Sequence, residues 1–355
     1  MDYSLEIYLM SSKKSYKAIV FVIVIWALLF GLIPVDIAYG VAIGTGSAKV
    51  YDGAGLLTSE VISGQRYVYV GFAGMGYGTI AAAISASRAG DIVYAHSGTY
   101  NEHVVLSSGV SLIGEEGGAT IIHGNYQSQA NVIRALGGNR IENLTISGGG
   151  PYAGTPSSAV SIEGSNVTIT NNRVVDNQNY GLYIRSGSNI LIENNFLEKN
   201  GIGVQLPNSG TTILSNTFVN NNIAINVLNG PATVIRDNII TGSTFQSIYE
   251  FSWSAYSSGQ PASGNAIVEG NVLYNNKEKG GYYTKCLPPA VINQTLGNRI
   301  SDPLFINPAS GDYSVPVNSP AYGKGFELVN TPIIGPVTQK PPPGVWSGTH
   351  KNRPK

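Results

Sequence analysis

Apolar and polar residues alternate in short runs that recur through the middle of the chain. From Ala159 to Leu273 each run has apolar side chains at every second position, the period of a β-strand with one buried face. Short turns rich in Gly, Ser and Asn separate the runs, and no helical pattern intervenes. The alternating positions that we expect to be buried are Val160/Ile162, Leu182/Ile184, Val204/Leu206, Ile225/Val227, Val167/Ile169, Ile190/Ile192 and Ile213.

An asparagine follows the second strand of each run and marks a repeat. Asn172, Asn195, Asn216 and Asn238 are spaced 21 to 23 residues apart, and Asn271 follows after an insertion. Such a period is typical of repeat proteins, in which one unit buries its apolar face only by stacking on its neighbours. Because the units contain strands alone, the pattern predicts a parallel β-helix with two to three short strands per coil. We interpret the asparagines as structural residues whose amides bridge adjacent coils.

A short amphipathic helix is expected before the first coil. Residues 79–89 place Ile80, Ala83 and Ile84 on one face, with Thr79 as the N-cap and Gly90 as the stop. An open β-helix end exposes unpaired strand edges and apolar core. This helix is therefore predicted to cap the N-terminal end of the coils.

A set of motifs follows this helix: a Gly-Asp pair, a Gly-Thr-Tyr-x-Glu turn and a Leu-Ile-Gly strand end. In this order the chain resembles right-handed parallel β-helix proteins of the pectin-lyase-like superfamily, and residues 302–325 resemble the segment that often closes such domains. The resemblance spans about residues 77–325 and implies an all-β, right-handed parallel β-helix (solenoid) with a short N-terminal capping helix. It implies no single reaction, since the superfamily holds lyases, hydrolases, epimerases, adhesins and phage spikes. The matching residues are Gly90, Asp91, Gly98, Thr99, Tyr100, Glu102, Leu112, Ile113 and Gly114.

The chain divides into three parts. Residues 1–40 are predicted to be a signal peptide or membrane anchor, because lysines at positions 13–17 precede an uncharged run over residues 18–35 and a small-x-small pattern at Ala38 and Gly40. Residues 41–330 form the expected β-helix domain, and residues 331–355 form a Pro-rich, disordered tail. These features predict a secreted or cell-surface protein. It contacts a membrane only if the N-terminal segment stays uncleaved, and then only through that segment.

Composition agrees with a strand-rich solenoid. Of 355 residues 44 are Gly and 12% are charged, against about 25% in an average soluble protein. The net charge of zero gives no basic face for nucleic acid. The single cysteine, Cys286, excludes an intrachain disulfide framework.

The densest polar patch that the repeat predicts lies on the first strand of each coil. In-register stacking places Arg134, Ser161, Tyr183, Gln205 and Asn226 in one outward column. Glu163 and Arg185 occupy the same position in successive coils, so we expect them to lie close enough to pair. Arginine binds a uronate carboxylate in a bidentate manner, and Tyr or Arg is suited to moving the proton next to that carboxylate. Tyr183, Arg185 and Glu163 are therefore candidate catalytic residues, and Arg134, Gln205 and Asn226 candidate substrate-binding residues. The structural alternative is a solvated sheet face.

A loop insertion adds aromatic candidates for substrate binding. Residues 249–264 include Tyr249, Trp253 and Tyr256, and insertions in repeat proteins often lie on the binding face. Aromatic rings are suited to stacking on sugar rings. The alternative is that these rings only cover exposed core.

Established catalytic motifs of the superfamily are missing. We find no Gly-His-Gly with clustered Asp, as in polygalacturonase-like hydrolases, and no Asp-Pro-His, as in alginate epimerases. Calcium remains a possible cofactor, but Asp176 and Asp237 are the only aspartates between Asp91 and Asp302, so no acidic cluster and no metal ligands are assigned. His96, His103 and His123 are interpreted as turn or surface residues.

Two hypotheses for function follow. The first is an exported polysaccharide-active protein, a lyase-type enzyme on an acidic glycan that uses the face of Tyr183 and Arg185. The second is a non-catalytic surface protein that binds glycan or serves as a structural element. A polysaccharide is the partner in the first hypothesis and, where the protein binds glycan, in the second.

Overall fold

The structure is a computed structural model. It describes residues 39–327 except 45–46, 53–55, 72–75, 117–118, 154–155, 208–209, 229–232, 252–265 and 278–295. Nearly all of the expected signal or anchor segment and the Pro-rich tail lie outside the described residues, as do Trp253, Tyr256 and Cys286. Within the described ranges, no helix has both the length and the apolar character needed to cross a membrane.

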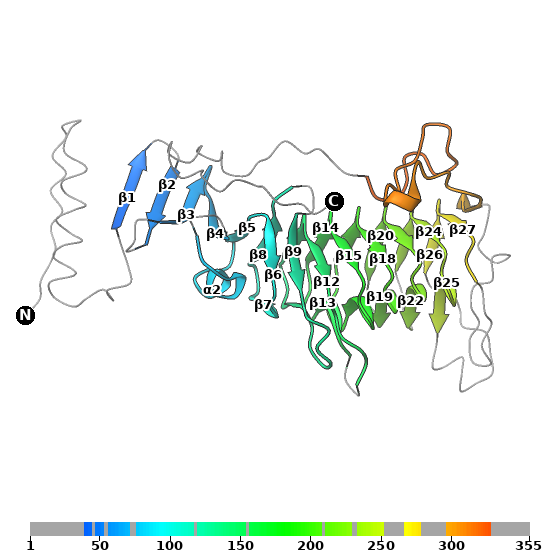
Figure 1. Ribbon diagram of the computed structural model, residues 1–355, viewed down its shortest axis with the longest axis horizontal. Coiled ribbons are helices and arrows are strands. Elements are labelled where there is room, and N and C mark those ends of the chain that lie inside the picture. Colours follow the sequence, from blue (N-terminus) through cyan, green and yellow to red (C-terminus); the bar gives the residue numbers. More distant parts are fainter. Residues whose placement is uncertain are drawn as a thin grey trace, which may run out of the picture.

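Three sheets run along a stack of coils, and the strands that the coils contribute to each sheet pair in parallel (Figure 1). The second sheet consists of β7 (Val104–Leu106), β10 (Ile133–Ala135), β13 (Ser158–Ile162), β16 (Tyr180–Ile184), β19 (Ile202–Pro207), β22 (Ile223–Leu228) and β25 (Gln246–Phe251). The first sheet consists of β1 (Tyr39–Gly44), β2 (Ser47–Tyr51), β3 (Leu57–Ile62), β4 (Gln65–Val70), β5 (Ile92–Ala95), β8 (Ser111–Gly114), β11 (Arg140–Glu142), β14 (Val167–Thr170), β17 (Ile190–Glu193), β20 (Thr211–Leu214), β23 (Val234–Arg236) and β26 (Ile267–Glu269). The third sheet consists of β6 (Gly98–Tyr100), β9 (Thr120–His123), β12 (Thr145–Ser147), β15 (Arg173–Val175), β18 (Phe196–Glu198), β21 (Thr217–Val219), β24 (Ile239–Thr241), β27 (Val272–Tyr274) and β28 (Arg299–Ile300).

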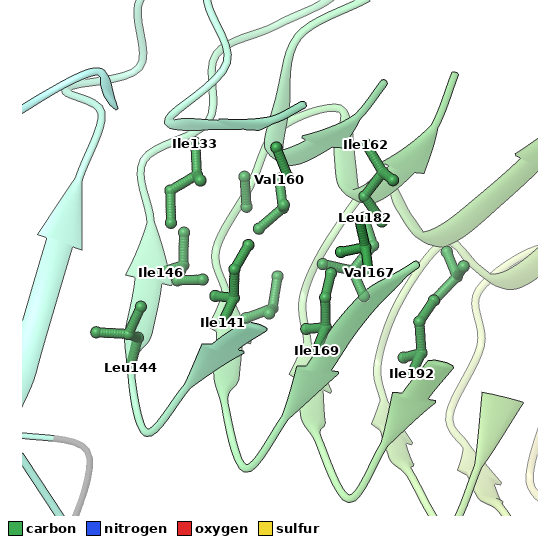
Figure 2. Close-up of a cluster of buried hydrophobic side chains, with 14 of the residues drawn as sticks. Ile133, Ile141, Leu144, Ile146, Val160, Ile162, Val167, Ile169, Leu182 and Ile192 are labelled. Atoms are coloured by element: carbon green, nitrogen blue, oxygen red, sulfur yellow. The ribbon is translucent and has the colours of Figure 1, made fainter. Parts of the chain in front are cut away.

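The alternating apolar residues form one continuous core inside the coils. All positions expected to be buried have 0 to 2% of their surface exposed. The register aligns Ile141 with Ile169 and Ile169 with Ile192, so identical residues stack from coil to coil, as Figure 2 shows. The predicted parallel β-helix is therefore confirmed, with three strands per coil.

The repeated asparagines form a buried ladder through the stack. The side-chain Nδ2 of Asn195 donates to Oδ1 of Asn216 over 3.0 Å, and its Oδ1 accepts from the backbone N–H of Asn172 over 3.0 Å. The same pattern continues through Asn238 to Asn271. The predicted bridging role is confirmed, and the bonds satisfy backbone groups at the bends, where no strand pairing exists.

A second asparagine ladder lies five residues further along each coil. Asn177 donates to Asn200 over 2.8 Å, and Asn200 donates to Asn221 over 2.9 Å. The chain therefore supports two of its bends in the same way.

The described residues before helix α2 (Ile80–Ser85) include four strands outside the coil repeat. Strands β1 to β4 pair in antiparallel fashion, and β4 joins β5 in parallel, so the first sheet continues beyond the coils (blue in Figure 1).

Helix α2 (Ile80–Ser85) matches the expected helix but ends four residues earlier than the sequence suggested. Its buried residues Ile80, Ala83 and Ile84 join the core, and the helix packs against β4, β5 and β7. Gly90, which was expected to end the helix, lies instead in the turn before β5, where its φ is +94°.

A C-terminal segment, residues 302–327, returns over the outer face of the third sheet. Phe305 and Val315 pack against a second apolar cluster of Ile239, Val272 and Ala321. At its far end, the backbone N–H of Glu327 donates to Oδ1 of Asn194 over 2.7 Å, and Nδ2 of Asn194 donates to the backbone C=O of Glu327 over 2.8 Å. We call residues 302–327 the C-terminal cover.

Candidate functional site

The outward residues of the second sheet form the predicted column. The register pairs each member with the next, and Tyr249 of β25 extends the column beyond Asn226. Five strand spacings of roughly 4.8 Å give the column a length of about 24 Å. Its members are Arg134, Ser161, Tyr183, Gln205, Asn226 and Tyr249.

Glu163 lies between two arginines at one end of this column. Arg134 donates to it in a bidentate manner, with Nε 3.1 Å from Oε1 and Nη2 2.7 Å from Oε2. Arg185 approaches to only 3.8 Å and keeps 67% of its side chain exposed. The expected proximity of Glu163 and Arg185 is present, but the diagonal neighbour Arg134 forms the tight pair. Long side chains reach diagonal neighbours across parallel strands.

Electrostatics at this position favour the charged forms. The hydrogen bonds from Arg134 hold the pKa of the Glu163 carboxyl below its usual range, and Arg185 adds to this effect. The same pair raises the pKa of Arg134. Arg185 therefore offers the more available positive charge, because the guanidinium of Arg134 is occupied by the carboxylate.

An aromatic pair stands beside the arginines. The rings of Tyr180 and Tyr183 stack with centroids 5.0 Å apart and an interplanar angle of 21°. Burial raises the pKa of the Tyr180 hydroxyl, with smaller contributions from Tyr183 and Tyr152. Tyr180 was not predicted, because residues three apart do not share a face of a regular strand.

Gln205 and Asn226 form an incompletely bonded amide pair in the middle of the column. Asn226 donates from Nδ2 to Oε1 of Gln205 over 2.8 Å. The remaining Nε2 of Gln205 and Oδ1 of Asn226 are shielded from solvent and have no hydrogen-bond partner among the described residues. A ligand reaches these two atoms only after neighbouring side chains move.

The structure describes only one of the aromatic residues predicted to bind substrate. Tyr249 is half-buried, lies next to Asn226 in the register and has the ring of Phe245 at 6.4 Å. The placements expected for Trp253 and Tyr256 fall outside the described residues.

The histidines and acids of the described ranges do not assemble into a metal-binding group of three or more. His96 follows β5 and is buried, and burial lowers its pKa. His123 lies in β9, with Nδ1 2.9 Å from the Ser147 hydroxyl, and His103 is exposed.

The column thus combines three kinds of contact along one extended face. It presents an available guanidinium, a stacked tyrosine pair and amide groups with unused hydrogen-bonding capacity. These groups suit a long, hydroxyl-rich ligand that carries carboxylates. Chemically, Tyr183 and Arg185 share one strand face two residues apart, where a proton donor or acceptor and a carboxylate-binding group would act together.

The chain has distant similarities to solved structures. The chain is similar to the pectin methylesterase from Aspergillus niger, with 16% identity over 59% of this chain and 77% of the other and a TM-score of 0.39. It is similar to the alginate lyase from Paenibacillus sp. str. FPU-7, with 12% identity, 56% and 85% coverage and a TM-score of 0.40. The rice weevil pectin methyl esterase gives 16% identity, 61% and 83% coverage and a TM-score of 0.39. Such distant likeness says nothing of activity.

A search of curated proteins finds no match. The family model for the right handed beta helix region matches residues 107–260 and 158–303, which together span more than half of the chain. This range includes the column from Arg134 to Tyr249 and both asparagine ladders. The chain therefore belongs to the right-handed β-helix family.

Proposed function

We propose that the protein binds an acidic polysaccharide along the outer column of the second sheet. The observation that carries this proposal is the exposed Arg185 guanidinium two residues along the chain from Tyr183, whose ring stacks on that of Tyr180. An aromatic platform beside a cation matches a sugar ring that carries a carboxylate, because one group stacks on the ring and the other pairs with the charge.

The rest of the column extends this binding surface. Gln205 Nε2 and Asn226 Oδ1 supply a donor and an acceptor suited to sugar hydroxyl groups. The length of about 24 Å along the column favours a polymer over a single sugar. The lysines at positions 13–17 followed by the uncharged run over residues 18–35 support export of the protein, and acidic polysaccharides occur outside cells.

Lyase-type cleavage of the same glycan is a second candidate function. It is favoured by the placement of Tyr183, Glu163 and Arg185 on adjacent coils at one end of the column, where Arg185 approaches Glu163 to 3.8 Å. In β-elimination a base removes the proton next to the carboxylate while a positive charge stabilises the resulting anion. In this scheme Tyr183 moves the proton, Arg185 binds the carboxylate, and Glu163 keeps the arginines in place.

The test uses the full chain with polygalacturonate and alginate, each with and without calcium. Glycan binding is measured by calorimetry, and ultraviolet absorbance follows the unsaturated product of elimination. We expect Arg185→Ala to weaken binding about ten- to a hundredfold, as for loss of a charged hydrogen bond. Arg236→Ala is the matched control, since Arg236 is another exposed arginine paired to a glutamate, but on the first sheet.

Tyr183→Phe separates the two candidates, because it removes the hydroxyl and keeps the ring. A lyase loses its absorbance signal in this variant and still binds, whereas a non-catalytic binder shows no absorbance in any variant. Equal binding by the wild type, Arg185→Ala and Arg236→Ala would contradict the assignment of the second-sheet face.

A further inference from the structure

A cavity of about 580 Å³ lies between the third sheet and the far end of the C-terminal cover. Its floor is formed by the outward side chains of Arg173 and Phe196, on β15 and β18. Its roof includes Tyr313, Val315 and Phe326 of the cover. The volume falls within the range of pockets that take small molecules, about 300–1,000 Å³.

Three aromatic rings enclose this cavity. Phe196 is fully buried although it points out of the coil, because the rings of Tyr313 and Phe326 lie 4.9 and 6.0 Å from it. The guanidinium of Arg173 lies over the Phe196 ring, 4.4 Å from the ring centre. The cavity therefore has an aromatic part of its wall next to one planar cation at the floor, and the rest of its lining is polar or charged.

Arg173 has no carboxylate within ion-pair distance among the described residues. The nearest acid that affects it, Glu198, is engaged by Lys199 at 3.2 Å and by the Tyr313 hydroxyl. Burial lowers the pKa of Arg173 although the Glu198 carboxylate acts in the opposite direction, so the charged form has only partial compensation. An anion placed against this guanidinium would supply the rest.

The other charged groups of the lining are already bonded or face solvent. Lys324 pairs with Asp237, and the Asp312 carboxylate accepts from the backbone N–H of Ser314 over 3.0 Å. Glu327 is attached through its backbone N–H, which donates to Asn194, and the residue is exposed to solvent. Arg173 thus remains the available charge on the floor of the cavity.

We infer that this cavity is a binding site for a small organic carboxylate with a ring-shaped body. The planar guanidinium receives the carboxylate through two parallel hydrogen bonds, and the rings of Phe196, Tyr313 and Phe326 contact the body of the ligand. The site lies on the third sheet, so it is separate from the column on the second sheet and does not depend on the proposed glycan binding.

The test measures calorimetric binding of two carboxylates, benzoate and galacturonate, to the full chain. Benzamide and galactose serve as their uncharged counterparts. We expect at least one carboxylate to bind saturably and at least tenfold more tightly than its counterpart, and to lose affinity as the pH falls through the pKa of its own carboxyl group. Which of the two binds more tightly shows whether the site prefers an aromatic or a sugar ring.

Arg173→Gln is expected to weaken carboxylate binding at least tenfold, while Arg236→Gln, on the first sheet and outside both proposed sites, leaves it unchanged. Thermal unfolding of both variants checks that they are folded. The comparison of carboxylate with uncharged counterpart needs no variant, so the inference stays testable if Arg173→Gln fails to fold. Equal affinity for both members of each pair, no binding of any probe, or full affinity in folded Arg173→Gln would overturn it.

Discussion

Asn226 donates a hydrogen bond to Gln205 across adjacent coils over 2.8 Å, and the pair leaves one buried donor and one buried acceptor without a partner in the part of the chain that the structure describes. Each such atom costs about 1–3 kcal/mol of stability. An amide pair that exists only to stabilise the coils would not carry this cost, since apolar residues would fill the same space. We therefore connect the pair with ligand binding.

This connection gives opposite predictions for stability and for binding. In the double variant Gln205→Leu with Asn226→Leu we expect the free energy of unfolding to be unchanged or to rise by about 1–2 kcal/mol, because no buried polar atom is left unpaired. Glycan affinity should fall at least tenfold. Denaturant unfolding and calorimetry measure the two effects. A double variant that keeps full glycan affinity would show that the pair has no part in binding.

The asparagine ladder should be essential for stability. Asn195→Ala removes side-chain bonds to two adjacent coils, the one donated to Asn216 and the one accepted from the backbone N–H of Asn172, and it leaves that buried N–H without its partner. We expect a loss of about 2–4 kcal/mol in the free energy of unfolding. Asn222→Ala is the control, because the Asn222 side chain is exposed, accepts an exposed hydrogen bond from Thr244, and should cost less than about 0.5 kcal/mol. Equal losses would argue against the ladder as the main support of the bends.

The pairing of Arg134 with Glu163 should appear as a pH dependence. The folded-state pKa of Glu163 is lowered, so its contribution to stability is complete above the usual carboxyl pKa and is lost as the pH falls through the lowered value. We expect Glu163→Gln to reduce the free energy of unfolding by about 1 kcal/mol at pH 7. The difference from the wild type should shrink steadily below about pH 4.5. Unfolding curves at a series of pH values measure it, and a difference that is independent of pH would contradict the pairing.

The attachment of the C-terminal cover can be tested at a single glycine. Gly325 has φ +74°, and a Cβ there would lie 2.6 Å from Ile239 Cδ1 and from Thr217 Oγ1. Gly323 has nearly the same conformation, φ +71°, but open space around it. We expect Gly323→Ala to cost about 1 kcal/mol for the backbone alone, and Gly325→Ala at least about 1 kcal/mol more. Thermal unfolding and proteolysis of the cover measure the difference, and equal effects would mean that the cover does not pack as described.

The sequence was sufficient to predict the coils and the column. A period of 21 to 23 residues with alternating apolar positions determines which residues stack, because parallel strands in register repeat the same position. Arg134, Tyr183, Gln205 and Asn226 therefore lie where the pattern put them.

Other features had no periodic signal. The choice of Arg134 over Arg185 as the partner of Glu163 depends on side-chain conformations, which spacing alone does not determine. The cavity at Arg173 and Phe196 is formed by a segment more than a hundred residues later in the chain, with no repeat to align it. Strands β1 to β4 lie in a Gly-rich region whose antiparallel pairing does not follow the coil period.

The contacts of the C-terminal cover bridge longer stretches of sequence than the contacts between coils. Neighbouring coils of the ladder from Asn172 to Asn238 meet across 21 to 23 residues, whereas the cover joins Phe326 to Thr217 across 109 residues and Glu327 to Asn194 across 133. Closing each of the longer loops costs about 1.5 kcal/mol more in chain entropy than closing one coil. The cover also needs folded coils as the surface on which it packs. The cover is therefore expected to close only after the coils that receive it have formed, wherever in the stack folding begins.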